Sequence, residues 1–94
     1  MNEETKTITG AGVFSHCFFE SSDEIIFVMS DGGMEYNVIF RHDGDKDKIK
    51  RVHSIPKNAL LRVTGLHLVE CCPRYDGTKY VQHIIKTSQE PTLL

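Results

Sequence analysis

The chain has 94 residues, of which 39% are hydrophobic and 26% are charged, and its net charge at pH 7 is −2. This length suits one domain rather than two, and the balance of residue types excludes overall disorder. The charge also excludes a strongly basic protein, so any positive surface must come from local clustering.

The first segment with a strand pattern covers residues 7–19. It is rich in β-branched and aromatic residues and is interrupted by Gly10 and Gly12. This combination predicts a long strand that bends at a bulge or corner formed by the glycines. Residues 1–6, which are polar and acidic, predict a flexible tail before it.

Two further strands are predicted around the sequence Asp-Gly-Gly at 31–33, which is a strong turn signal. Residues 24–30 form a continuous apolar run, which indicates a largely buried strand. Residues 34–41 alternate, so one set of side chains should face the core and the other should face outward. The expected inward set is Met34, Tyr36, Val38 and Phe40; the outward set includes Asn37, Ile39 and Arg41.

The character of the chain changes over residues 42–57, which are mostly charged. Ile49, Val52 and Ile55 have weak helical spacing, and Pro56 follows them. We therefore expect a loop that carries a short helix or a single helical turn and ends at the proline.

A second long strand is predicted over 58–70, with Gly65 in its middle. The apolar positions shift by one residue across this glycine, from Leu61 and Val63 to Leu66 and Leu68. A β-bulge at Gly65 would account for the shift.

The remaining residues predict a hairpin and a tail. Residues 71–78 contain a proline and an Asp-Gly pair and predict the hairpin loop. Residues 79–87 predict the last strand, and 88–94 predict a flexible tail.

The order of these elements predicts an all-β domain over residues 1–94. Long strands that bend at Gly10 and Gly65 allow an antiparallel sheet to close on itself. The segments ITGAGVF, EIIFVMSDGGMEYNVIF and ALLRVTGLHLVECCPRYDGTKYVQHI together resemble the OB fold, and within it the single-stranded-DNA-binding and replication-protein-A-like domains. The resemblance implies a five-stranded antiparallel Greek-key barrel with a short helical connector between the third and fourth strands.

The resemblance also implies a place for a ligand. OB domains bind across the second and third strands, between the loops after the first and fourth strands. Single-strand binders combine cationic groups with aromatic platforms on which bases stack. The candidate binding residues are Asn37, Arg41, Arg74, Tyr75, Lys79 and Tyr80. Tyr75 is the leading stacking candidate because it lies in a loop, where burial is not required.

Other charged and aromatic residues have simpler interpretations. The connector cations alternate with aspartates, which indicates a solvated loop whose charges compensate each other. The acidic stretch 20–24 would repel phosphate. Four phenylalanines are expected in the core: Phe14, Phe18, Phe19 and Phe27.

The expected partner is single-stranded nucleic acid, with DNA favoured over RNA, in an accessory role in replication, recombination or repair. The alternative is a protein-interaction OB module, a subunit or adaptor, without nucleic-acid binding. The near-neutral charge and the acidic loop motivate this alternative. A protein partner and a homo-oligomer therefore stay open, whereas no membrane association is expected.

No catalytic signature is visible, so no enzymatic activity and no cofactor are expected. Cys17, Cys71 and Cys72 are odd in number, and two of them are adjacent, which favours reduced thiols in a cytoplasmic protein. No signal peptide is visible at the N-terminus. The histidines and cysteines lack the paired spacing of a structural zinc site, so no metal is expected.

Overall fold

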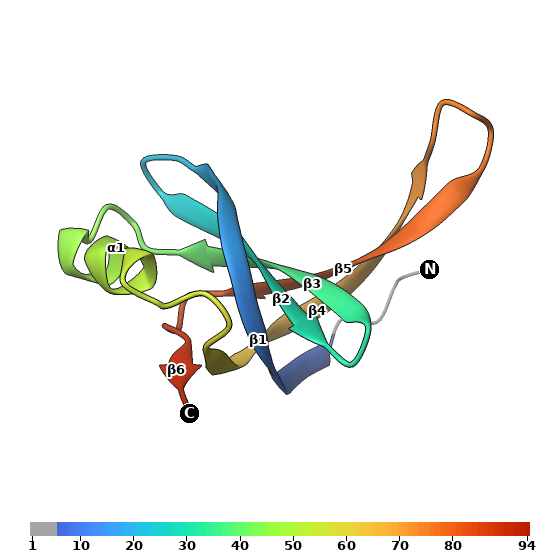
Figure 1. The fold of residues 1–94 in the computed structure, drawn as a ribbon. Helices are drawn as coiled ribbons and strands as arrows, with labels where there is room; N and C mark the ends of the chain where they lie inside the picture. Colours follow the sequence, from blue (N-terminus) through green and yellow to red (C-terminus); the bar gives the residue numbers. More distant parts are fainter. Residues whose placement is uncertain (1–5) are drawn as a thin grey trace.

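Six strands and one helix make up residues 6–94, the part of the chain that the computed structural model describes (Figure 1). In chain order they are β1 (Lys6–Glu20), β2 (Glu24–Asp31), β3 (Met34–Arg41), α1 (Lys46–His53), β4 (Leu60–Pro73), β5 (Lys79–Thr87) and β6 (Thr92–Leu93). The predicted order of five strands with a helix after the third is confirmed. Of the expected N-terminal tail, residues 1–5 lie outside the described residues, and Lys6 begins β1.

The sheet closes into a barrel because β1 pairs with two partners. Its residues 6–13 pair with β4, and its residues 13–20 pair with β2. The ring then runs β1-β2-β3-β5-β4 and returns to β1. The pairing of β3 with β5 is parallel, unlike the antiparallel arrangement that the sequence predicted throughout. The chain passes through α1 and returns along β4 before β5 begins. Because β4 runs antiparallel to β5, β5 runs in the same direction as β3.

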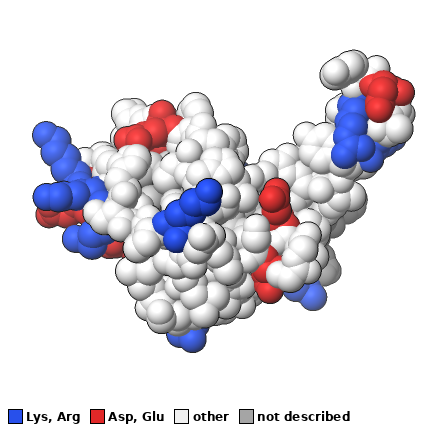
Figure 2. Space-filling view, viewed as in Figure 1, with Lys and Arg blue, Asp and Glu red and all other residues white. Residues whose placement is uncertain are grey.

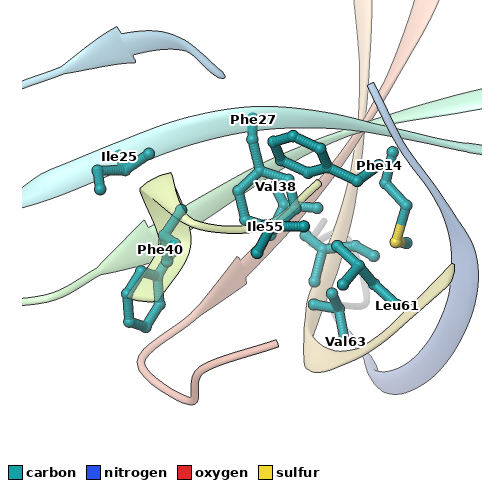
Figure 3. Close-up of a cluster of buried hydrophobic side chains, with 11 residues drawn as sticks. Phe14, Ile25, Phe27, Val38, Phe40, Ile55, Leu61 and Val63 are labelled. Atoms are coloured by element: carbon teal, nitrogen blue, oxygen red, sulfur yellow. The ribbon is translucent and has the colours of Figure 1, made fainter. Parts of the chain in front are cut away.

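The hydrophobic core fills the barrel interior with one side of every long strand (Figure 3). Phe27, Val38, Phe40, Leu61 and Ile85 are fully buried there. The helix α1 adds Val52, and Ile55 follows the helix. Met34, which the alternation placed in the core, is instead exposed, because it lies at the β2–β3 turn beyond the barrel interior.

Two glycines lie where strands approach each other too closely for a side chain. A Cβ at Gly12 would lie 2.6 Å from the carbonyl oxygen of Ser30. A Cβ at Gly65 would collide with the Lys86 carbonyl oxygen and would lie 2.9 Å from Cγ2 of Ile85. At Gly10 the nearest atom would be 4.0 Å away, so the close approach on β1 is at Gly12 rather than at Gly10.

The β-bulges lie on β1 and not at Gly65. The register of β1 against β2 shifts between Phe14 and His16, and again between Cys17 and Phe19. The pairing of β4 with β1 is continuous through Gly65, and the pairing of β4 with β5 runs without a shift from Leu66 onward. The predicted bulge at Gly65 is therefore wrong: the alternation carries on through the glycine and leaves Leu66 exposed.

Beyond the barrel, β4 and β5 continue as a two-stranded hairpin that projects from the body of the molecule (Figure 1). We call residues 70–82 the arm; its strands pair with each other, whereas β3 joins β5 only from His83 onward. The arm contributes to an elongated shape of 41 × 27 × 25 Å.

The C-terminal residues are held against the barrel and not extended as the expected tail. Leu93 in β6 pairs with Leu61 in β4. The Glu90 carboxylate accepts two hydrogen bonds from the Arg51 guanidinium, at 2.6 and 2.9 Å, and these hydrogen bonds lower the pKa of Glu90. Among residues 6–94 there is no helix with the length and apolar character that crossing a bilayer requires.

Candidate nucleic-acid interface

The outer side of the sheet carries two rows of side chains that cross β1, β2, β3 and β5. In register, the first row is His16, Val28, Asn37 and Ile84, and the second is Phe19, Ile26, Ile39 and Lys86. We call these eight residues the outer face. Along β2, β3 and β5 the rows alternate with core residues, as side chains of a sheet do. The outer face is mostly apolar and holds few polar groups.

Asn37 lies at the centre of this face, between Val28 and Ile84. Both neighbours point away from the core, yet only 8% of Val28 and 7% of Ile84 are exposed. Neighbouring side chains therefore cover them, and the centre of the face is closely packed. The structure thus places the Asn37 amide, as the sequence predicted, on the outer side of β3.

The arm joins the outer face because β5 continues past Ile84. Residues two apart on a strand share a side, so Tyr80 and Gln82 follow Ile84 outward. The Arg74 guanidinium carbon lies 4.8 Å from the centre of the Tyr80 ring. This cation–π contact brings two of the predicted residues together. Tyr75 lies beside them at the tip and is fully exposed.

Hydrogen bonds fix the conformation of the arm tip. The Arg74 N–H donates to the Thr78 carbonyl at 2.8 Å, and the Gly77 N–H donates to the Arg74 carbonyl at 3.1 Å. The Asp76 carboxylate accepts from the backbone N–H and the hydroxyl of Thr78, which lowers its pKa. Arg74 and Lys79 form no ion pair within the described chain.

Arg41, a further predicted residue, is both distant and neutralised. Its guanidinium lies 2.7 Å from the Asp43 carboxylate and 3.7 Å from the Glu24 carboxylate. Its neighbour Phe40 pairs with Thr87 at the far end of β5 from Tyr80. At about 3.3 Å per residue, Arg41 and Tyr80 are therefore separated by about 25 Å in the direction of the strands. The structure therefore does not bring Arg41 together with the arm residues.

Phe18 and Phe19 were expected in the core, and this expectation is wrong. They are 54% and 49% exposed, at the end of β1 that borders the outer face. Alternation from Phe14 already places Phe19 outward, and the bulges explain the exposure of Phe18. The first bulge leaves Ser15 unpaired, and the second leaves Phe18 unpaired. As a result Cys17 faces the core with Phe14, and Phe19 pairs with the outward Ile26.

These aromatic residues are the part of the site that sequence reasoning missed. The His16 and Phe18 rings lie 6.5 Å apart, and Phe19 belongs to the second row of the outer face. Three aromatic side chains therefore lie at the end of the outer face opposite the arm. The adjacent pair Phe18 and Phe19 was the available signal, because two successive residues of a regular strand do not both face the core.

Positive charge is sparse around the face. Lys86 is exposed, forms no ion pair within residues 6–94, and lines an open groove of about 500 Å³ with Ile39, Arg41 and Thr64. Figure 2 shows cationic side chains at the arm, with an acidic one beside them, and a second cationic group over α1. The connector cations are on α1, as the sequence suggested, and Arg51 there is bound to Glu90.

The remaining reactive groups considered are the three thiols. Burial, followed by the charge of Glu20, raises the pKa of the Cys17 thiol. Cys71 is exposed on the arm, and Cys72 donates to the Gln82 amide oxygen at 3.4 Å. Within residues 6–94 no three potential metal ligands lie together.

Comparisons with known proteins agree with the barrel. No protein-family model matches the sequence, and no curated protein matches it. Among solved structures, the chain is similar to a mitochondrial single-stranded DNA binding protein from S. cerevisiae, Rim1. The likeness covers 97% of this chain and 95% of that chain, with a TM-score of 0.65 and 17% sequence identity. The chain therefore has an OB fold like that of a single-stranded DNA binding protein, and the resemblance noted in the sequence is confirmed at the level of the fold.

Proposed function

We propose that this chain binds single-stranded nucleic acid along the outer face and the arm, with DNA favoured over RNA. The observation that carries the proposal is the continuity of the outer face with exposed aromatic residues at both of its ends, Phe18 and Phe19 on β1 and Tyr80 and Tyr75 on the arm. The similarity of the fold to that of a single-stranded DNA binding protein supports the same function. An accessory role in replication, recombination or repair would follow from such binding.

The proposed mechanism is passive. Bases stack on Tyr75, Tyr80 and Phe19, and each stack contributes about 1–3 kcal/mol. Phosphates contact the cations that have no acidic partner in the described chain, namely Arg74, Lys79 and Lys86. Asn37 offers both hydrogen-bond donors and an acceptor to a base edge over the outer face.

A titration with fluorescently labelled oligonucleotides at low salt tests this function. The proposal predicts saturable binding of a single strand, and much weaker binding of a duplex of the same sequence, whose bases are already stacked. The double variant R74A/Y75A should bind at least tenfold more weakly than the wild type. The exposed Arg62 on β4 provides the control R62A, which should bind normally. Absence of binding by the wild type, or full binding by R74A/Y75A, would contradict the proposal.

A protein-interaction module is the second candidate function. Two observations favour it: the outer face is mostly apolar, and Glu24 and Asp43 neutralise Arg41. An apolar surface with little net charge is also suited to a protein partner. Light scattering and pull-down with the single variant I39D distinguish the two functions. A protein module would lose a retained partner or an oligomer in this variant, and its wild type would not bind the oligonucleotide.

A further inference from the structure

Two histidines meet where the arm leaves the barrel. His67 on β4 and His83 on β5 are half-buried, and Nε2 of His67 lies 3.1 Å from Nδ1 of His83. Their rings stack with centroids 5.3 Å apart and an interplanar angle of 13°. The Tyr36 ring meets both imidazole rings edge-on, with its centroid 5.9 Å from that of His67 and 5.8 Å from that of His83. The rings are therefore held by packing from three strands.

The pair has access to solvent. His83 lines an open groove of about 610 Å³ together with Met34, Glu35 and Val81, between the β2–β3 turn and the arm. The Glu35 carboxylate at this groove is exposed and makes no ion pair within the described chain. A cation approaching the histidines would thus pass a negative charge.

We propose that His67 and His83 bind one divalent transition-metal ion of the kind that prefers imidazole ligands, such as Ni²⁺, Cu²⁺ or Zn²⁺. The distance between the two nitrogens supports this. Histidine nitrogens lie about 2.0–2.1 Å from such ions, so two nitrogens 3.1 Å apart would form an angle of about 100° at the ion. This angle lies between those of square-planar and tetrahedral coordination.

Binding of the ion needs no additional base to remove a proton from the histidine pair. In the hydrogen-bonded pair one of the two facing nitrogens carries a proton. When the ion binds, that ring moves its proton to its other nitrogen, so that both facing lone pairs are free. His67 then binds through Nε2 and His83 through Nδ1, and water fills the remaining positions. The bound ion would connect β4 to β5 at the root of the arm.

Local spacing along β4 would group His67 with Cys71 and Cys72. Those cysteines lie further along the arm, where their pairing partners are Val81 and Tyr80. The partner of His67 is the cross-strand His83, 16 residues later, which a search for local spacing does not find.

Calorimetric titration of the wild-type protein with Ni²⁺ tests the proposal. We expect one ion per chain, and an affinity at least tenfold lower in each of the variants H67N and H83N. The matched control is H53N, because His53 is exposed and contacts Glu20 instead of a second histidine. It should bind as the wild type does. Thermal unfolding in the presence of a chelator establishes that each variant is folded.

A second measurement uses the unmodified protein and so does not depend on variants that fold. Ni²⁺ is paramagnetic, and it should broaden the ¹H–¹⁵N signals of residues 66–68 and 82–84 before those of any other region. Broadening centred on His16, His53 or the arm cysteines would overturn the proposal. The same holds for wild-type protein that binds no Ni²⁺, or for H67N and H83N with unchanged affinity.

Discussion

The guanidinium of Arg74 lies over the ring of Tyr80, 4.8 Å from its centre, although the two residues are on opposite sides of the hairpin turn. This contact covers one face of the aromatic ring with a positive charge that has no acidic partner in the described chain. The pair thus offers a base a stacking surface and a phosphate a cation at one place. It joins the tip of the arm to the side of β5 that continues into the outer face.

Removal of the Tyr80 ring should weaken binding of single-stranded DNA without unfolding the chain. In Y80A one base loses its stacking surface, worth about 1–3 kcal/mol, which corresponds to an affinity loss of roughly 5- to 150-fold. The variant Y80F keeps the ring and should bind within about twofold of the wild type. Fluorescence anisotropy with a labelled oligonucleotide measures both. Equal losses in Y80A and Y80F would show that the hydroxyl, and not stacking, is what the ligand contacts.

The aromatic end of the outer face can be tested with two phenylalanines. Phe19 is 49% exposed, so F19A should change the free energy of unfolding little but should weaken oligonucleotide binding at least fivefold. Phe27 is fully buried, and F27A should lower the free energy of unfolding by about 3–5 kcal/mol. Urea denaturation and anisotropy are the two measurements. A large loss of stability in F19A would mean that this ring packs in the core after all.

The different outcomes for these residues show what the sequence could predict. Alternation in β3 located Asn37 correctly, because that strand pairs without a register shift. In β1 each bulge adds one unpaired residue, so alternation counted from Phe14 places Cys17 outward and Phe18 inward, whereas Cys17 packs against the core and Phe18 is exposed. Local residue patterns do not encode where such an extra residue falls.

The carboxylates that neutralise Arg41 could not be predicted from the sequence, for a related reason. Glu24 faces Arg41 across the β2–β3 ladder, and this register depends on the turn between the strands. The sequence alone showed an outward arginine but not its cross-strand carboxylate. Likewise, the parallel pairing of β3 with β5 depends on how the chain crosses the barrel, and no local pattern reports it.

The salt dependence of binding should reveal how few cations take part. Three phosphate contacts, from Arg74, Lys79 and Lys86, predict that a plot of log affinity against log salt concentration has a slope of about −2. K86A should make the slope shallower, by about 0.7. R41A should leave it unchanged, because Glu24 and Asp43 already neutralise Arg41. A shallower slope in R41A would show that the ligand displaces those carboxylates.

Closure of the barrel can be tested at two glycines. G65A places a Cβ against the Lys86 carbonyl oxygen and Ile85, so the two strands must separate. Crowding of this kind lowers the free energy of unfolding by about 1–3 kcal/mol. At Gly10 the nearest atom to a new Cβ would be 4.0 Å away, so G10A should be tolerated. Thermal unfolding compares the two variants, and equal stability of both would contradict the close approach of β4 and β5.

The central claim, that a single strand lies on the outer face and the arm, is tested most directly by chemical-shift mapping. ¹H–¹⁵N spectra of the labelled protein would be recorded while an unlabelled oligonucleotide is added. The largest changes should fall on Phe19, Asn37, Tyr80 and Ile84, and the signals of α1 and β6 should hardly move. Changes concentrated on α1 and β6, with the outer face unaffected, would contradict the claim.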